Sequence, residues 1–273
     1  MTTTSATADL PRTRRRAARM PRLVNAELLK LRKRRGLVLV TLALTLLPII
    51  IAYVVLVTLH AVEPAKHGPA GGLDNFSGSL YLLAQLGVVA AILIGATAGA
   101  GDIGSGVFRE LVVTGRSRFA LFGARLPAAF GLALAATWAG YALTAVASTA
   151  LAGSLEAPGA ALLVEGAGWL ALVVGLALVL ALGLSSALGS RSITIGIALG
   201  LELVVMPALL QIRALGSLRE LLPVAATDSL APSALFDGQV VVPTSVSVAV
   251  VVVAAWTVVP LVAGAWRTCK RDA

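Results

Sequence analysis

The sequence predicts an all-α integral membrane protein with six transmembrane helices and both termini in the cytoplasm. Apolar residues make up 58% of the 273 residues and charged residues only 13%, whereas about a quarter of an ordinary soluble domain is charged. A soluble fold cannot cover so much apolar surface with so few charges, so lipid must surround most of the chain. The apolar residues also gather into runs long enough to cross a bilayer.

Six apolar segments reach the length of about 20 residues that a helix needs to cross the hydrocarbon core. Hydropathy identifies them because backbone groups in lipid must be paired within their own segment. The first run is longer than the apolar region of about 7 to 15 residues in a cleavable signal peptide, so it is expected to be retained. The predicted transmembrane domain covers residues 37–266, with spans at 37–59, 80–101, 127–152, 166–188, 192–210 and 244–266.

Basic residues give the orientation of these spans. Of the 22 Lys and Arg residues, only Lys66, Arg213 and Arg219 fall on one side, and the rest flank the other side. Loops rich in Lys and Arg stay in the cytoplasm, so both termini are predicted to be cytoplasmic. Because the basic residues flank apolar spans, the net charge of +9 indicates contact with anionic membrane lipids rather than with nucleic acid.

The chain ends are expected to differ in structure. Residues 1–20 are rich in Arg and lack apolar periodicity, which predicts a disordered basic tail. Within 21–36, Leu28 and Leu31 share a helical face surrounded by basic residues, which predicts an amphipathic helix in the membrane interface. The alternative is a first span that extends into the cytoplasm. Residues 267–273 form a short cytoplasmic tail.

The segment 95–127 joins the second and third spans on the cytoplasmic side. Asp102 marks the exit from the membrane, and Phe108 and Leu111 lie on one face of a short helix. Ser117 can cap a second helix after the break. The pattern predicts two short helices with one apolar stripe and a charged rim. The alternative is a loop that only rests on lipid headgroups.

The segment 211–243 joins the last two spans and is too long for an ordinary structureless loop. Leu215, Leu218 and Leu222 are helically spaced within it. The spacing predicts short helices that lie at, or dip into, the outer membrane interface. An ordinary folded outer loop is the alternative.

Glu202 is the only acidic residue deep in an apolar span. A charge at the bilayer centre costs about 2.5 to 3.5 kcal/mol on insertion scales. Glu202 is therefore expected to face the bundle interior, water or a partner, with Gln85 among its candidate neighbours. Two interpretations stay open: a contact in a translocation path, or a protonated, hydrogen-bonded packing residue.

Small residues four apart indicate close helix packing. Gly95 and Gly99 form such a pair in the second span, and Gly196 and Gly200 form one in the fifth. Such faces let helix backbones approach each other.

Two stretches carry a resemblance to a known family. Residues 26–35 read A-E-L-L-K-L-R-K-R-R just ahead of the first span. At the exit of the second span, an acidic residue, a glycine, an apolar helix and an S-R pair follow one another: Asp102, Gly106, Phe108 to Val113, Ser117 and Arg118. With six spans and a long last outer segment, the chain resembles the permease subunit of type 2 ABC exporters.

The resemblance implies a multi-pass subunit in the plasma membrane of a bacterium. It implies a dimer with a second permease copy or a paralogue, and a separate ABC ATPase subunit that holds ATP and Mg²⁺. In that family the cytoplasmic segment after the second span meets the ATPase. The coupling residues are then Asp102, Gly106, Phe108, Arg109, Glu110, Leu111, Ser117 and Arg118. No lysine follows a G-x-x-x-x-G run, so ATP hydrolysis is expected on the partner chain and no cofactor on this one.

Two other function classes have weaker support in the sequence. A secondary transporter or channel working without an ATPase would place several ionisable groups at mid-membrane, and Glu202 is the only one. An intramembrane enzyme needs a nucleophile and a base at similar depth. The only histidines, His60 and His67, lie in the first outer loop. No catalytic or metal-binding residue is therefore expected.

Overall fold

The computed structural model describes residues 20–104, 106, 117–236 and 242–270, and every regular element in these ranges is helical. Six of the helices are long and apolar enough to cross a membrane. The predicted all-helical class and multi-pass membrane character are thus confirmed. The six are α3 (Arg35–Val62), α4 (Leu73–Gly104), α6 (Arg118–Ala150), α7 (Ala160–Leu188), the composite of α8 (Arg191–Gly200), η1 (Leu201–Val205) and α9 (Met206–Gln211), and α12 (Val246–Lys270).

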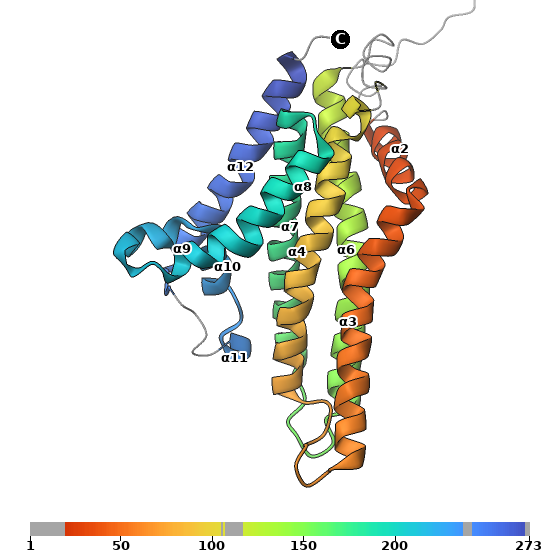
Figure 1. Ribbon diagram of the computed structural model, residues 1–273, viewed down its shortest axis with the longest axis vertical. Helices are drawn as coiled ribbons and strands as arrows, with labels where there is room; N and C mark the ends of the chain where they lie inside the picture. Colours follow the sequence, from red (N-terminus) through yellow and green to blue (C-terminus); the bar gives the residue numbers. More distant parts are fainter. Residues whose placement is uncertain (1–19, 105, 107–116, 237–241, 271–273) are drawn as a thin grey trace, which may run out of the picture.

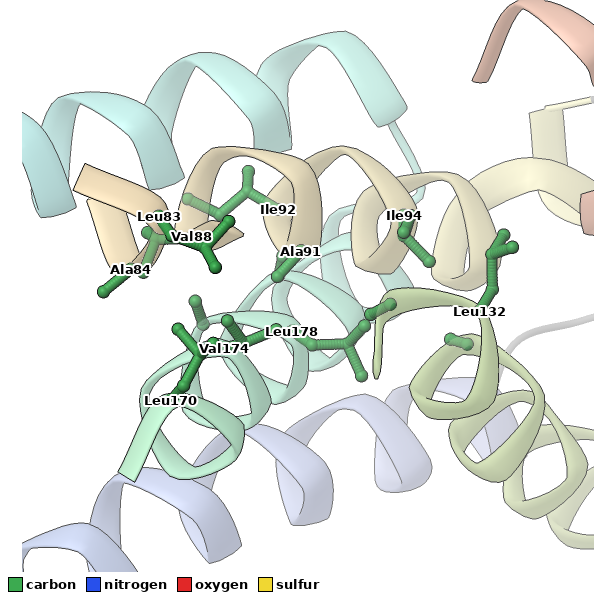
Figure 2. Close-up of a cluster of buried hydrophobic side chains, with 14 of the residues drawn as sticks. Leu83, Ala84, Val88, Ala91, Ile92, Ile94, Leu132, Leu170, Val174 and Leu178 are labelled. Atoms are coloured by element: carbon green, nitrogen blue, oxygen red, sulfur yellow. The ribbon is translucent and has the colours of Figure 1, made fainter. Parts of the chain in front are cut away.

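Helices α4 and α7 form the centre of the bundle. In each, 67% of the most apolar window is buried, against 22% in α3 and 11% in α12. Figure 1 shows α3, α4, α6 and α7 running side by side, while α8 and α12 lean away. In Figure 2, Ala91 of α4 lies toward Leu178 of α7, and Ile92 is directed to the other side of α4. The outer helices therefore offer most of their surface to lipid or to another subunit.

Two glycines allow the close approach of α4 and α7. A Cβ atom at Gly95 would lie 2.6 Å from the carbonyl oxygen of Leu178, and one at Gly99 would lie 2.6 Å from that of Leu182. The hydroxyl of Ser185 also donates to the carbonyl oxygen of Gly95 at 3.3 Å. Any side chain at these two glycines would push the helices apart.

The glycines of the fifth span, unlike those of α4, do not lie at a close contact between described helices. A Cβ atom at Gly196 or Gly200 would meet nothing within 4 Å among the described residues. These glycines therefore do not bring two of the described helices together. Spacing in the sequence alone does not separate the two cases, because it does not say which face of a helix meets a neighbour.

The helix α2 (Met20–Lys33) covers most of the range 21–36, where the sequence predicts an amphipathic helix, and begins one residue before it. The backbone breaks at Arg34 before α3 begins, and α2 meets α3 at an angle (Figure 1). Leu31 and Glu27 are buried where α2 packs against α6 and α4. The membrane-interface position of α2 stays a prediction.

Short helices follow α9, within the segment for which the sequence predicts them. They are η2 (Arg213–Leu221), α10 (Pro223–Ser229) and α11 (Ser233–Phe236). Two tryptophans hold this segment: Trp169 of α7 donates to the carbonyl oxygen of Thr227 at 2.9 Å, and Trp256 of α12 donates to that of Leu221 at 3.0 Å. In Figure 1, α9 and α10 lie beside the middle of α4 rather than beyond the end of the bundle.

The two ends of the bundle differ in charge. The guanidinium of Arg118 donates to the carbonyl oxygen of Cys269 at 3.0 Å, so the start of α6 and the end of α12 lie together. Figure 1 shows α2 at this same end. Among the described residues, all Lys and Arg except Lys66, Arg213 and Arg219 belong to α2 or lie at this end of the spans. This grouping agrees with the loop charges, and the side of the membrane stays a prediction.

Single cysteines provide the test of orientation, after Cys269 is replaced by serine. We expect cysteines at the exposed positions Gly68, Ser154 and Ser217 to react with a membrane-impermeant maleimide in intact cells. A cysteine at Ser117 is expected to react only after the cells are opened. Reaction at Ser117 in intact cells, with protection at the other three, would reverse the orientation.

The α4–α7 contact predicts a difference between two glycines of α4. Gly99→Val inserts a side chain where no space exists, and overpacking of this kind costs about 1 to 3 kcal/mol or more. Gly78→Val is the matched control, because Gly78 is exposed and has nothing within 4 Å of its Cβ position. We expect only Gly99→Val to lower the midpoint of thermal unfolding in detergent. The midpoint is measured by size-exclusion chromatography of samples heated to a series of temperatures. Equal midpoints would mean that the helices do not meet at Gly99.

Candidate functional site

Four charged side chains meet at the end of the bundle that carries the basic residues. We call Glu27, Lys30, Asp102 and Arg125 the ion cluster. The ammonium of Lys30 lies 2.6 Å from Glu27 Oε1 and 2.9 Å from Asp102 Oδ2. The guanidinium of Arg125 lies 3.2 Å from the same Oδ2 atom. The cluster thus joins α2, α4 and α6.

Burial makes the pair of Asp102 and Arg125 unusual. Arg125 is 1% exposed and Asp102 is 9% exposed. Arg125 also donates to the carbonyl oxygen of Gly99 at 3.1 Å, so α6 is fixed to the backbone of α4 as well as to its carboxylate. Removing one partner from a buried ion pair leaves an uncompensated charge. This contact therefore restricts α4 and α6 to one relative position.

Glu27 lies at the edge of the ion cluster. Burial raises the pKa of Glu27 above its ordinary value, and the neighbouring Lys30 acts in the opposite direction. The Lys30 ammonium stands between the carboxylates of Glu27 and Asp102. One basic side chain of α2 thus shields two acids that would otherwise repel each other.

The ion cluster flanks the segment that the sequence predicts to couple to an ATPase. Asp102 lies on α4 just before it, and Ser117 and Arg118 lie just after it at the start of α6. Gly106 adopts a left-handed conformation with φ 75°, which glycine tolerates best. The remaining predicted coupling residues lie outside the described residues: Phe108, Arg109, Glu110 and Leu111.

The start of α6 differs in detail from the expected short second helix. The helix that begins at Arg118 runs without interruption to Ala150. Ser117 occupies the position before it, but its hydroxyl makes no capping hydrogen bond. Phe119 is exposed and Phe122 is buried. The helix after the break is thus the first part of the third span.

A cavity of about 300 Å³ opens between α4, α7, the composite fifth span and α10. Because it is nearer the start of α4 than its end, the predicted orientation places it in the outer half of the protein. Its lining includes both residues predicted for a translocation path, Glu202 and Gln85. Other polar or aromatic side chains of the lining are Tyr81, Trp169, Gln211 and Asp228.

The backbone around Glu202 is irregular for an identifiable reason. Residues Leu201–Val205 form a π-helical turn, in which the N–H of Met206 donates to the carbonyl oxygen of Leu201. Pro207 follows directly and has no N–H for the carbonyl four residues back. Single π-turns inside helices occur frequently at functional sites. The widened turn is where Glu202 lines the cavity.

Asp228 adds a second carboxylate to the lining. It lies on α10, and burial raises its pKa to about 6. No ion pair or side-chain hydrogen bond joins either Asp228 or Glu202 to another described residue. The cavity therefore holds two carboxylates that the described part of the chain does not neutralise.

The sequence did not identify Glu27, Lys30, Arg125 or Asp228 as site residues, although it carries signals for Arg125 and Asp228. Arg125 counted as a loop charge, yet Leu121, Arg125, Ala128 and Leu132 follow the spacing of a single helical face, and all four are buried. Asp228 is the only charged residue between Val224 and Leu235. An isolated acid in an apolar stretch is the same signal that identified Glu202.

The described residues contain no group of three or more His, Cys, Asp or Glu side chains able to hold a metal ion. The chain matches no known protein-family model and no curated protein. Its function must therefore be inferred from the ion cluster, the cavity and the pattern of the sequence.

The ion cluster predicts a large stability effect at Arg125. Arg125→Met removes the more deeply buried of the two basic partners of Asp102 and leaves Lys30 beside it, so it should destabilise the fold by up to about 3 to 5 kcal/mol. Arg191→Met is the control, because Arg191 is exposed and makes no ion pair among the described residues. Thermal unfolding in detergent measures both. Adding Asp102→Asn to Arg125→Met should cost less than the sum of the two single changes, since the residues are in contact. Strict additivity would contradict the assigned pairing.

Proposed function

We propose that this chain is the membrane-spanning permease subunit of a type 2 ABC exporter. It forms the translocation path as a dimer with a second copy or a paralogue. A separate ATPase subunit binds and hydrolyses ATP with Mg²⁺, and this chain carries out no covalent chemistry. The plasma membrane of a bacterium is the proposed location, with both termini in the cytoplasm.

The observation that supports this proposal best is the position of the ion cluster. Asp102 and Arg125 stand on either side of the segment 105–116, and Lys30 links them to α2. A force applied to that segment would reach α2, α4 and α6 together. A subunit driven by a separate ATPase needs such a connection, because the energy arrives at its cytoplasmic surface rather than inside the membrane.

The surfaces of the bundle suit the proposed partners. The outer spans α3 and α12 are mostly unburied within the chain, which leaves room for a second permease as well as for lipid. On α2, Arg22, Arg32 and Lys33 are exposed, and basic residues beside a span attract anionic lipid headgroups.

A secondary transporter working without an ATPase is the alternative function. The cavity favours it, because carriers coupled to ions or protons place ionisable groups inside the membrane. Glu202 and Asp228 are two such groups. The ion cluster favours the ABC permease instead, since it lies beside the proposed coupling segment at the end of the bundle that we propose to be cytoplasmic.

Association with an ATPase tests the proposed function. We expect the tagged full chain, purified from membranes of its own host, to bring down a chain with a phosphate-binding loop. Phe108→Ala removes the central aromatic side chain of the proposed coupling segment. The loss of an interface hot spot costs about 2 kcal/mol or more, which corresponds to roughly thirtyfold weaker association.

The matched control is Trp138→Ala, which removes an exposed aromatic side chain from the middle of α6. It should leave association unchanged when both variants are normalised to their level in the membrane. Wild-type association of Phe108→Ala would exclude this segment as the coupling element. Absence of any ATPase from the wild-type preparation, with transport intact, would favour the secondary transporter.

A further inference from the structure

We propose that the cavity lined by Gln85, Trp169, Glu202 and Asp228 is a binding site for an amphipathic organic cation. The ligand has one ammonium group and an apolar body of about the size of a small drug molecule. The site is a property of this chain alone. Only its use as an entrance to the translocation path depends on the proposed function.

The walls of the cavity set the shape and polarity of the ligand's body. The volume of about 300 Å³ falls at the lower end of the range for small-molecule sites. Ala84 and Val88 of α4, Leu176 of α7 and Leu210 of α9 are among the residues that line it. These aliphatic side chains offer no hydrogen bonds, so the part of the ligand that they surround must be apolar.

The carboxylates determine the charge of the ligand. Glu202 and Asp228 come from different elements and converge on one cavity. An isolated charge away from water is costly, and a bound cation offsets that cost for both carboxylates. Arg219 donates to the carbonyl oxygens of Leu210 and Gly216 at 3.2 Å. Its guanidinium forms an ion pair with neither carboxylate.

An aromatic wall adds to the preference for a cation. Trp169 is 7% exposed, and its indole N–H donates to the carbonyl oxygen of Thr227 on α10. This bond fixes the ring beside the helix that carries Asp228. The exposed Tyr81 of α4 also lines the cavity. An ammonium group over the face of such a ring is attracted by the electron-rich π system, whereas a neutral group is not.

Other occupants fit the lining less well. A bare metal ion prefers several oxygen or nitrogen ligands, and the described residues offer only two carboxylates here with mainly apolar neighbours. A lipid acyl chain would fill the apolar part and leave both carboxylates without a counter-charge. The combination of acids, aromatic rings and aliphatic walls matches a molecule with one charged and one apolar end.

A pair of probes that differ only in charge tests the proposal. The full chain is placed in nanodiscs of neutral phosphatidylcholine, without any ATPase. We expect saturable binding of radiolabelled phenylbutylamine above that of empty nanodiscs. Phenylbutanol, which has the same body and no charge, should compete at least about tenfold more weakly. Equal competition by the alcohol would show an apolar crevice for lipid, and absence of saturable binding would also overturn the proposal.

Variants locate the binding within the cavity. Glu202→Gln and Asp228→Asn should each weaken binding of phenylbutylamine by about tenfold or more. Because the two residues belong to different elements, one variant still tests the site if the other folds poorly. Glu165→Gln is the matched control, because Glu165 is an exposed carboxylate on α7 outside the cavity. If all three variants bind like wild type, the cation site lies elsewhere. Failure to find an ATPase partner would leave this result unaffected, so the two proposals fail separately.

Discussion

The close contact between α4 and α7 is the constraint on which the other features depend. Gly95 and Gly99 allow the two backbones to meet without intervening side chains. Nearer the start of α4 than this contact, the same two helices form part of the wall of the cavity, and the fifth span and α10 form most of the rest. Toward the end of α4, the carbonyl of Gly99 accepts a hydrogen bond from Arg125, next to the ion cluster. One helix pair thus positions polar groups at two depths.

Polar groups in this fold are concentrated where they are paired or where a ligand can reach them. Most hydroxyls inside the bundle donate to a carbonyl one turn earlier, as Thr45, Thr137 and Thr144 do. Such bonds satisfy the hydroxyl within its own helix and place no demand on a neighbour. The ion cluster and the cavity carboxylates are not satisfied in this way, so they are the polar groups that call for a separate explanation. The charges of the ion cluster balance one another, whereas the described residues provide no counter-charge for the cavity carboxylates.

The sequence predicted the number of spanning helices because each span must satisfy its own backbone, which makes hydropathy a local signal. It also identified Glu202 and Gln85, since a polar residue in an apolar run stands out on its own. It did not reveal the partner of Asp102, because the pairing with Lys30 and Arg125 joins residues far apart in the chain. Asp228 was missed for a related reason: α10 is too short to show periodicity, so nothing local relates it to α7.

The spanning helices differ greatly in length, and this has a consequence for the surrounding bilayer. The helix α6 has 33 residues, about 50 Å at 1.5 Å per residue, and extends well beyond a hydrocarbon core of about 30 Å. The composite fifth span has 21 residues, about 32 Å, and Figure 1 shows it strongly inclined to α4. An inclined helix of that length falls short of the core thickness. Hydrophobic mismatch should then thin the bilayer beside α8 and α9, which brings lipid headgroups and water closer to the mouth of the cavity.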